Sequence, residues 1–129
     1  MKTLLLATSC LFIVTAASQA QDYRLPSICM GNYSNRDSLD TDLLEGEQLL
    51  AVCNNSSGST AQVAEFHLYI YQKGIDPVIF LSSGNVVRGG IIGIMKSSAK
   101  GSRFRFEKVK GRTSNGSIVT LNSMTLYKK

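Results

Sequence analysis

The stretch that decides the fold is residues 102–127, which read SRFRFEKVKGRTSNGSIVTLNSMTLY. Polar and apolar side chains alternate over 102–109 and again over 117–127, as they do in half-buried β-strands. Between these segments lies Asn115-Gly116, and both of these residues tolerate the positive φ of a tight turn. The pattern therefore predicts a β-hairpin.

The two faces of this hairpin differ in chemistry. Phe104 and Phe106 fall on one side of the first strand, which we expect to be buried. Arg103, Arg105 and Glu107 fall on the other side, which we expect to face solvent. In the second strand the apolar phase slips after residue 121, which predicts a β-bulge at 122–123.

Further strands are predicted upstream of the hairpin. Residues 63–71 alternate strongly and are rich in aromatic and β-branched side chains, while 48–53 and 78–81 form shorter apolar runs. Residues 86–97 fit either a short helix or a Gly-bent strand, because an apolar helical stripe is interrupted by three glycines. The total is six to seven short strands with at most one short helix. We therefore expect an all-β, immunoglobulin-like β-sandwich.

The N-terminal 20 residues have the pattern of a cleaved signal peptide. Lys2 precedes an apolar stretch over 4–17, and small residues follow at 18–20. The stretch is shorter than the roughly 20 apolar residues of a membrane-spanning helix. We expect residues 21–129 to be a single periplasmic or secreted domain with no integral membrane segment after cleavage.

Two cysteines remain after the signal peptide, Cys29 and Cys53. In an oxidising compartment they are expected to form a disulfide, which would stabilise the fold by about 3 kcal/mol in the chain-entropy model. The alternative is a pair of separate buried thiols.

Charge is distributed unevenly along the chain. Residues 21–65 carry a net charge of −5, and residues 66–129 carry +9. This asymmetry either creates a dipolar surface that orients a partner, or is neutralised when the two halves pack together.

Residues for catalysis or metal binding are scarce. His67 is the only histidine, it lies within a predicted strand, and no G-x-S-x-G elbow accompanies it. One histidine and two cysteines do not provide zinc ligands at tetrahedral spacing. We expect no enzyme activity, no metal and no cofactor; a catalytic role for His67 is the least favoured hypothesis.

A basic cluster lies on the closing hairpin. It is either a solvated strand face or a docking surface for an acidic partner, an anionic lipid or a polysaccharide. Nucleic acid is not expected as a partner, because the interleaved Phe104 and Phe106 should face the core. The predicted partner-binding residues are Arg103, Arg105, Lys108, Lys110 and Arg112.

Three stretches resemble a known family: KGSRFRFEKVKG at 100–111 with the Asn115-Gly116 turn, TLNSM at 120–124, and EFHLYIY at 65–71. They are similar to the C-terminal domain of the gliding-motility and type IX secretion shaft protein of the bacterial periplasm. The resemblance covers about residues 63–127. It implies an immunoglobulin-like domain without a catalytic site that assembles with periplasmic or outer-membrane-associated proteins. The family's shaft protein has an inner-membrane helix and several domains, whereas here a signal peptide precedes one domain.

Two functional hypotheses follow for this chain. The first is an exported, non-enzymatic protein that acts through protein–protein contacts in the cell envelope. The alternative is a secreted inhibitor or ligand-binding module acting on an enzyme or glycan. The second would need a rigid exposed loop, for which 56–59 and 75–77 are the candidates.

Overall fold

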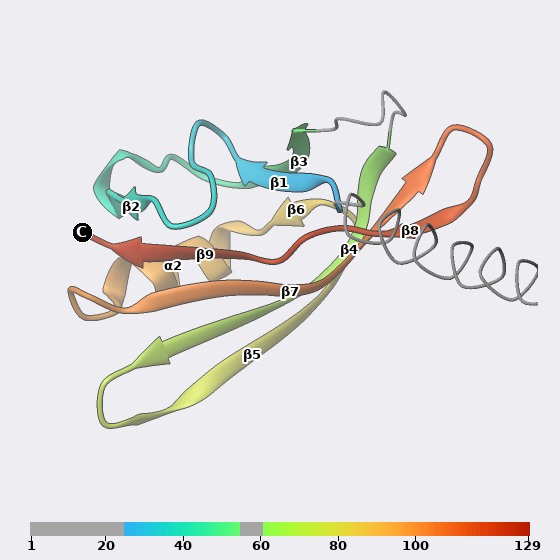
Figure 1. Ribbon diagram of the computed structural model, residues 1–129. Coiled ribbons are helices and arrows are strands. Elements are labelled where there is room, and N and C mark those ends of the chain that lie inside the picture. Colours follow the sequence, from blue (N-terminus) through green and yellow to red (C-terminus); the bar gives the residue numbers. More distant parts are fainter. Residues whose placement is uncertain (1–24, 55–60) are drawn as a thin grey trace, which may run out of the picture.

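The structure is a computed structural model that describes residues 25–54 and 61–129. The predicted signal peptide and the candidate loop at 56–59 lie outside the described residues. Figure 1 shows the elements in chain order. The strands are β1 (Ser27–Met30), β2 (Ser38–Leu39), β3 (Gln48–Asn54), β4 (Ala61–Gln72), β5 (Ile75–Ser83), β6 (Val86–Val87), β7 (Arg103–Thr113), β8 (Ile118–Thr120) and β9 (Met124–Lys128). The helices are the 3-10 helix η1 (Thr41–Leu43) and the α-helix α2 (Gly89–Ser97).

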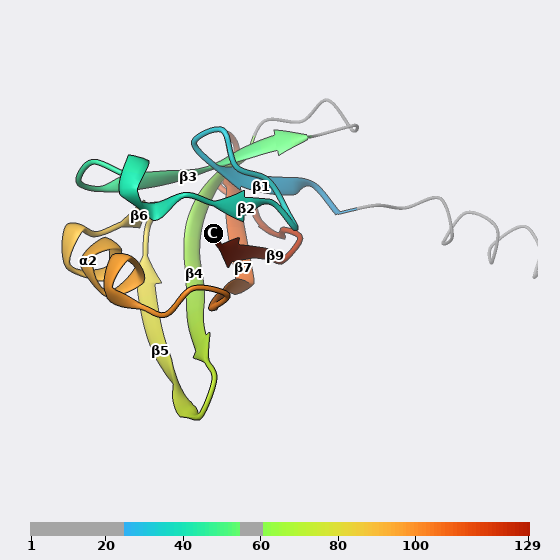
Figure 2. The same cartoon turned by 90° about the vertical axis from the view of Figure 1, so that its left-hand side faces the viewer.

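The strands form two sheets. The larger sheet has the order β2-β9-β7-β4-β5, with β8 also paired to β7, and the smaller sheet has the order β1-β3-β6. In Figure 2 the smaller sheet and α2 lie on the same side of the larger sheet and leave its other side open. The predicted all-β sandwich with one short helix is thereby confirmed.

The core fills the space between these layers. Phe66, Phe104 and Phe106 are completely buried, and the rings of Phe66 and Phe106 lie 5.7 Å apart in a tilted arrangement. They pack with Met30 from β1 and Met95 from α2. The predicted inward face of the hairpin is therefore correct, and it fixes which side of the larger sheet remains for solvent or a partner.

Residues 86–97 divide into two elements, which resolves the ambiguity left by their sequence. Residues 86–87 form β6, and the rest is helical despite Gly89, Gly90 and Gly93. The helix buries Ile92 and Met95 against the core. Burial of this apolar stripe outweighs the backbone entropy that glycine costs in a helix.

The last predicted strand is interrupted at the position where its slipped phase predicted a β-bulge. Residues 121–123 are not in a strand, and they separate β8 from β9. Leu121 and Met124 are nevertheless both buried. Because of this break, and because β2 and β6 are only two residues long, the described residues contain nine strands instead of six or seven.

Strand β7 is longer than predicted and contains a bulge at Lys108. Lys108 has a φ of 50°, and the strand changes phase there, since Phe106 and Val109 are both buried. The pairing is His67 with Glu107 and then Glu65 with Lys110, so two residues of β7 stand opposite the single Phe66 of β4. This extra residue keeps the following basic side chains on the solvent side of the sheet.

Candidate docking surface

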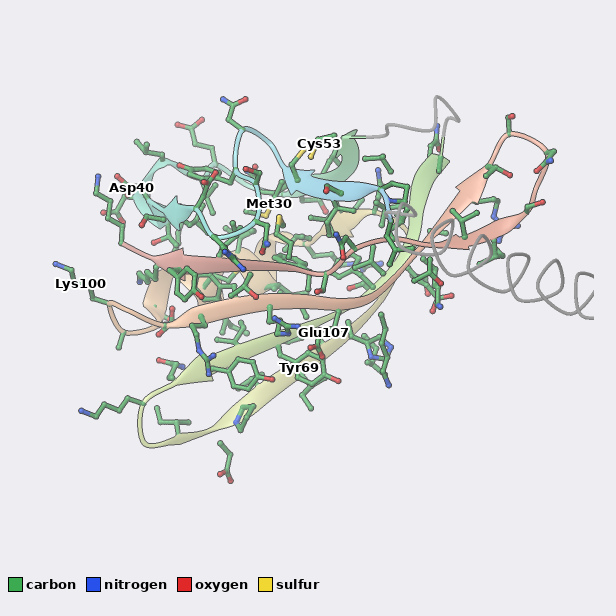
Figure 3. All side chains as sticks on the ribbon, in the orientation of Figure 1. Met30, Asp40, Cys53, Tyr69, Lys100 and Glu107 are labelled. Atoms are coloured by element: carbon green, nitrogen blue, oxygen red, sulfur yellow. The ribbon has the colours of Figure 1, made fainter. Side chains whose placement is uncertain are left out.

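The open side of the larger sheet carries a group of aromatic and charged side chains, which we call the outer face. Regular alternation over residues 67–71 of β4 and 103–107 of β7 places these side chains opposite the buried phenylalanines. In Figure 3 the labelled Tyr69 and Glu107 lie on the side of the sheet remote from Met30 of the core. The outer face consists of His67, Tyr69 and Tyr71 on β4, Arg103, Arg105 and Glu107 on β7, and Tyr127 on β9.

One cross-strand row of the outer face is centred on Arg103. The strand register places Arg103 between Tyr71 and Tyr127. Its guanidinium carbon lies 4.8 Å from the centre of the Tyr71 ring, a cation–π contact. The rings of Tyr69 and Tyr71 are nearly parallel, with centres 6.1 Å apart. These contacts restrict the three side chains, so a partner would not have to order them on binding.

The neighbouring row is centred on Arg105. Its side chain forms an ion pair with Glu107, and its Nη1 donates a hydrogen bond of 2.9 Å to Thr125 Oγ1. Both members of this ion pair are partly exposed, so the pair itself contributes little to stability. Its effect is to fix the position of the guanidinium, which can still donate to a second carboxylate.

The structure divides the five predicted basic residues into two groups. Arg103 and Arg105 lie within the aromatic rows of the outer face. The others follow along β7 beyond the bulge, where Lys110 Nζ donates a hydrogen bond of 3.2 Å to Thr120 Oγ1. Lys108 and Arg112 are exposed. All five thus reach the solvent side of one strand.

The tyrosines of the outer face were not included among the predicted site residues. A signal for two of them was present, because Tyr69 and Tyr71 alternate with the apolar Leu68 and Ile70 along β4. A strand that buries its aliphatic residues turns those tyrosines outward. Tyr127 carried a similar signal, since it follows the apolar Leu126 in an alternating segment, but its pairing with Arg103 is known only from the register of β9 against β7.

The acidic N-terminal half does not neutralise this surface. Among residues 25–54 and 61–129 the only ion pair is the one between Arg105 and Glu107. Asp37 instead accepts a hydrogen bond from the Ser34 backbone, and Asp40 accepts one from the Asp42 backbone at the start of η1. The charges of the outer face therefore remain available to a partner.

His67 lies at the margin of the outer face. It is half-buried, opposite Glu107 on one side and Leu81 of β5 on the other. An open hollow of about 300 Å³ adjoins it, lined by Ala64, Glu65, His67, Leu81, Ser82 and Ser83. In the described part of the chain, no three metal-ligating side chains come together. Nor is any helix of that part long and apolar enough to cross a membrane.

The predicted disulfide between Cys29 and Cys53 is not formed. The cysteines lie on the adjacent strands β1 and β3 and approach to 2.9 Å, but they are not bonded. A disulfide requires a sulfur separation of about 2.05 Å. Cys29 stands opposite Ala51 in the register, so the two cysteines are diagonal neighbours. Both are free thiols, and Cys53 Sγ donates to the Ser27 carbonyl at 3.8 Å.

The thiol of Cys29 is a weaker acid than an ordinary cysteine thiol. Burial, a hydrogen bond with Cys53 and the charge of a Cys53 thiolate together raise the pKa of Cys29 to about 12, from an ordinary value of 9.0. The folded protein therefore holds this proton over a pH range in which the unfolded chain releases it. Linkage then requires that stability falls as pH rises from about 9 towards 12.

We expect Cys29→Ser to remove this part of the alkaline stability loss. The measurement is the free energy of unfolding by urea at several pH values from 8 to 11, for wild type and variant. All other ionisable residues are the same in both proteins, so the difference between the two curves isolates Cys29. Parallel curves would contradict the raised pKa.

No family model matches the chain, and no match was found among curated proteins. The function is therefore argued from the outer face itself.

Proposed function

We propose that this chain is an exported, non-enzymatic protein that acts through protein–protein contacts in the bacterial cell envelope. The docking surface is the outer face, and the partner is a protein with an acidic patch. The observation that carries the proposal is the row Tyr71–Arg103–Tyr127, with the Tyr71–Arg103 cation–π contact. Tyrosine and arginine are the residue types that most often dominate binding energy at protein interfaces.

The chemistry of the surface favours a protein over a sugar. Sugar rings stack on free aromatic faces, but Tyr69 and Tyr71 stack on each other and Arg103 lies over Tyr71. Around these contacts the surface presents hydroxyl and guanidinium groups, which suit carboxylates and backbone carbonyls. The strand continues with Lys108, Lys110 and Arg112, which would attract an acidic partner over a longer range.

Export is proposed on the N-terminal 20 residues, whose pattern is that of a signal peptide. A protein exported by this segment would be periplasmic or secreted. The resemblance to the type IX secretion shaft domain supports a partner near the outer membrane.

Site-specific photo-crosslinking tests this proposal. A photo-reactive amino acid replaces Tyr127, which is 40% exposed on the outer face, or Leu43, which is 69% exposed on η1. Helix η1 contacts α2 and so lies in the other layer of the fold. In a native cell-envelope extract we expect a discrete crosslinked protein from position 127 only.

Two outcomes would contradict the proposal. Crosslinks of equal yield from both positions would show that the outer face is not selective. A discrete product from position 43 alone would place the interface on the other layer. Recovery of a soluble enzyme at position 127 would instead favour the inhibitor hypothesis over envelope assembly.

A further inference from the structure

Strand β5 forms one edge of the larger sheet and carries exposed apolar side chains. It is the terminal strand in the sheet order, and Figure 1 shows it as the lowest strand, with no described element below it. Ile79 is 52% exposed and Leu81 is 72% exposed. An edge strand of nine residues with this composition is a template for pairing with another chain.

The direction of the backbone groups on β5 follows from one hydrogen bond. The N–H of Gly84 donates to the carbonyl of Ala64 on β4. In an antiparallel pair, alternate residues turn their N–H and C=O groups towards the neighbouring strand. Ser82, Phe80 and Val78 therefore face β4, whereas Ser83, Leu81 and Ile79 direct their backbone groups to the free edge.

Protective features are confined to the start of this edge, where β5 carries the charged Asp76 and its register against β4 shifts between residues 75 and 78. Pro77 lies in this segment and has no N–H to donate to a neighbouring strand. Residues 77–83 contain no charged side chain, although charges, lysine above all, commonly protect natural sheet edges. Ile79, Leu81 and Ser83 thus offer a complete set of backbone donors and acceptors at the free edge, with no charged side chain among them.

We propose that β5 pairs antiparallel with β5 of a second copy of this chain, forming a two-fold symmetric dimer. The register that uses all three outward residues places Leu81 opposite its own copy and Ile79 opposite Ser83 of the partner subunit. Pro77 is then left outside the paired segment. Every N–H directed at the interface finds a carbonyl, and the exposed Leu81 side chains cover one another.

Charge complementarity supports a second copy as the occupant. Antiparallel pairing brings Asp76 of the partner subunit to the end of β5 where Arg88 lies. Arg88 lines a hollow of about 250 Å³ at this edge, together with Phe80, Leu81, Ser82, Ser83 and Ile91. Symmetry provides two such Asp–Arg pairs. Association through the outer faces would instead oppose arginine to arginine, which is unfavourable.

The dimer would extend the proposed function without being required for it. Joining two β5 edges makes the two larger sheets continuous, so both outer faces lie on one extended surface. Two linked docking surfaces bind a multivalent partner more tightly than one does.

Sedimentation velocity of the purified protein over about a hundredfold range of concentration tests the dimer. We expect a concentration-dependent dimer in wild type. Leu81→Lys should weaken it at least about tenfold, because two lysines would meet at the symmetry axis. Leu43→Lys, at a residue of similar exposure on η1, is the matched control and should leave it unchanged. Circular dichroism verifies that both variants are folded.

A charge swap adds a test of register. Asp76→Arg and Arg88→Asp should each weaken the dimer, and the double swap should restore it. The proposal is overturned by a wild-type monomer at all concentrations, by a dimer that survives Leu81→Lys, or by a double swap that restores nothing. The photo-crosslinking experiment at position 127 is repeated in the Leu81→Lys variant. If the crosslinked protein is still obtained, the outer face binds its partner even where the dimer is weakened, so the two proposals can fail independently.

Discussion

Replacement of Phe106 by alanine is expected to lower the free energy of unfolding by about 3–5 kcal/mol. Phe106 is completely buried at the centre of the larger sheet, paired with Leu68 on β4 and Met124 on β9, and its ring contacts Phe66. Alanine would leave a cavity among side chains from three strands. Because these strands hold one another in place, the cavity cannot collapse without disturbing the sheet.

Urea unfolding measures this effect, with two variants for comparison. Phe106→Leu keeps most of the volume and should cost less than half as much as Phe106→Ala. Tyr127→Ala removes an aromatic ring from the outer face of the same sheet and should cost about 1 kcal/mol or less, since Tyr127 is 40% exposed and lies outside the core. A similar cost for Phe106→Ala and Tyr127→Ala would show that the inner face of β7 is not the core.

Reversal of both outer-face arginines is expected to reduce partner binding by about 100-fold, equivalent to about 2.7 kcal/mol. Arg103→Glu removes the cation–π contact with Tyr71, and Arg105→Glu places a carboxylate beside Glu107. An acidic partner would then face three carboxylates, where wild type presents two guanidinium groups and the single carboxylate of Glu107. Like charges brought together at an interface cost several kcal/mol.

The matched control for charge is Lys96→Glu with Lys100→Glu. Both lysines are exposed, at the end of α2 and in the following loop, and the change in net charge is the same. This control should bind the partner nearly as well as wild type. The outer-face variant should remain folded, because the ion pair it loses is partly exposed and contributes about 1 kcal/mol at most.

Much of the fold could be predicted because the alternation of polar and apolar side chains specifies which face of each strand is buried. Phe104 and Phe106 alternate with Arg103 and Arg105, and a period of two has only one arrangement with the apolar side buried. The Asn115-Gly116 turn sits where expected, with Gly116 at a φ of 88°. Local pattern and tertiary packing agree in this hairpin, so its faces could be assigned without a structure.

The bulge at Lys108 could not be assigned in the same way. Strict alternation from Phe104 would place Lys108 and Lys110 inside the core, although both were predicted to be outside. In the structure β7 has one extra residue at a positive φ, and this bulge keeps both lysines outside the core. Nothing in the local sequence specifies this position, because the burial of Val109 depends on contacts made across the sheet.

The cysteines and tyrosines also depend on strand pairing, which the local sequence does not specify. The disulfide predicted between Cys29 and Cys53 was wrong, since the strand register brings the two cysteines close together but they are not bonded. The row Tyr71–Arg103–Tyr127 combines three strands that are distant in sequence. Only the pairing of those strands brings it together.

The central claim is that the outer face binds an acidic protein partner, and affinity capture tests it most directly. Tagged wild type, Arg103→Glu/Arg105→Glu and Lys96→Glu/Lys100→Glu are each incubated with the same native cell-envelope extract at low salt, and the captured proteins are quantified by mass spectrometry. We predict a protein retained by wild type and by the lysine variant, and lost from the arginine variant. Equal retention of that protein by all three folded proteins would contradict the claim.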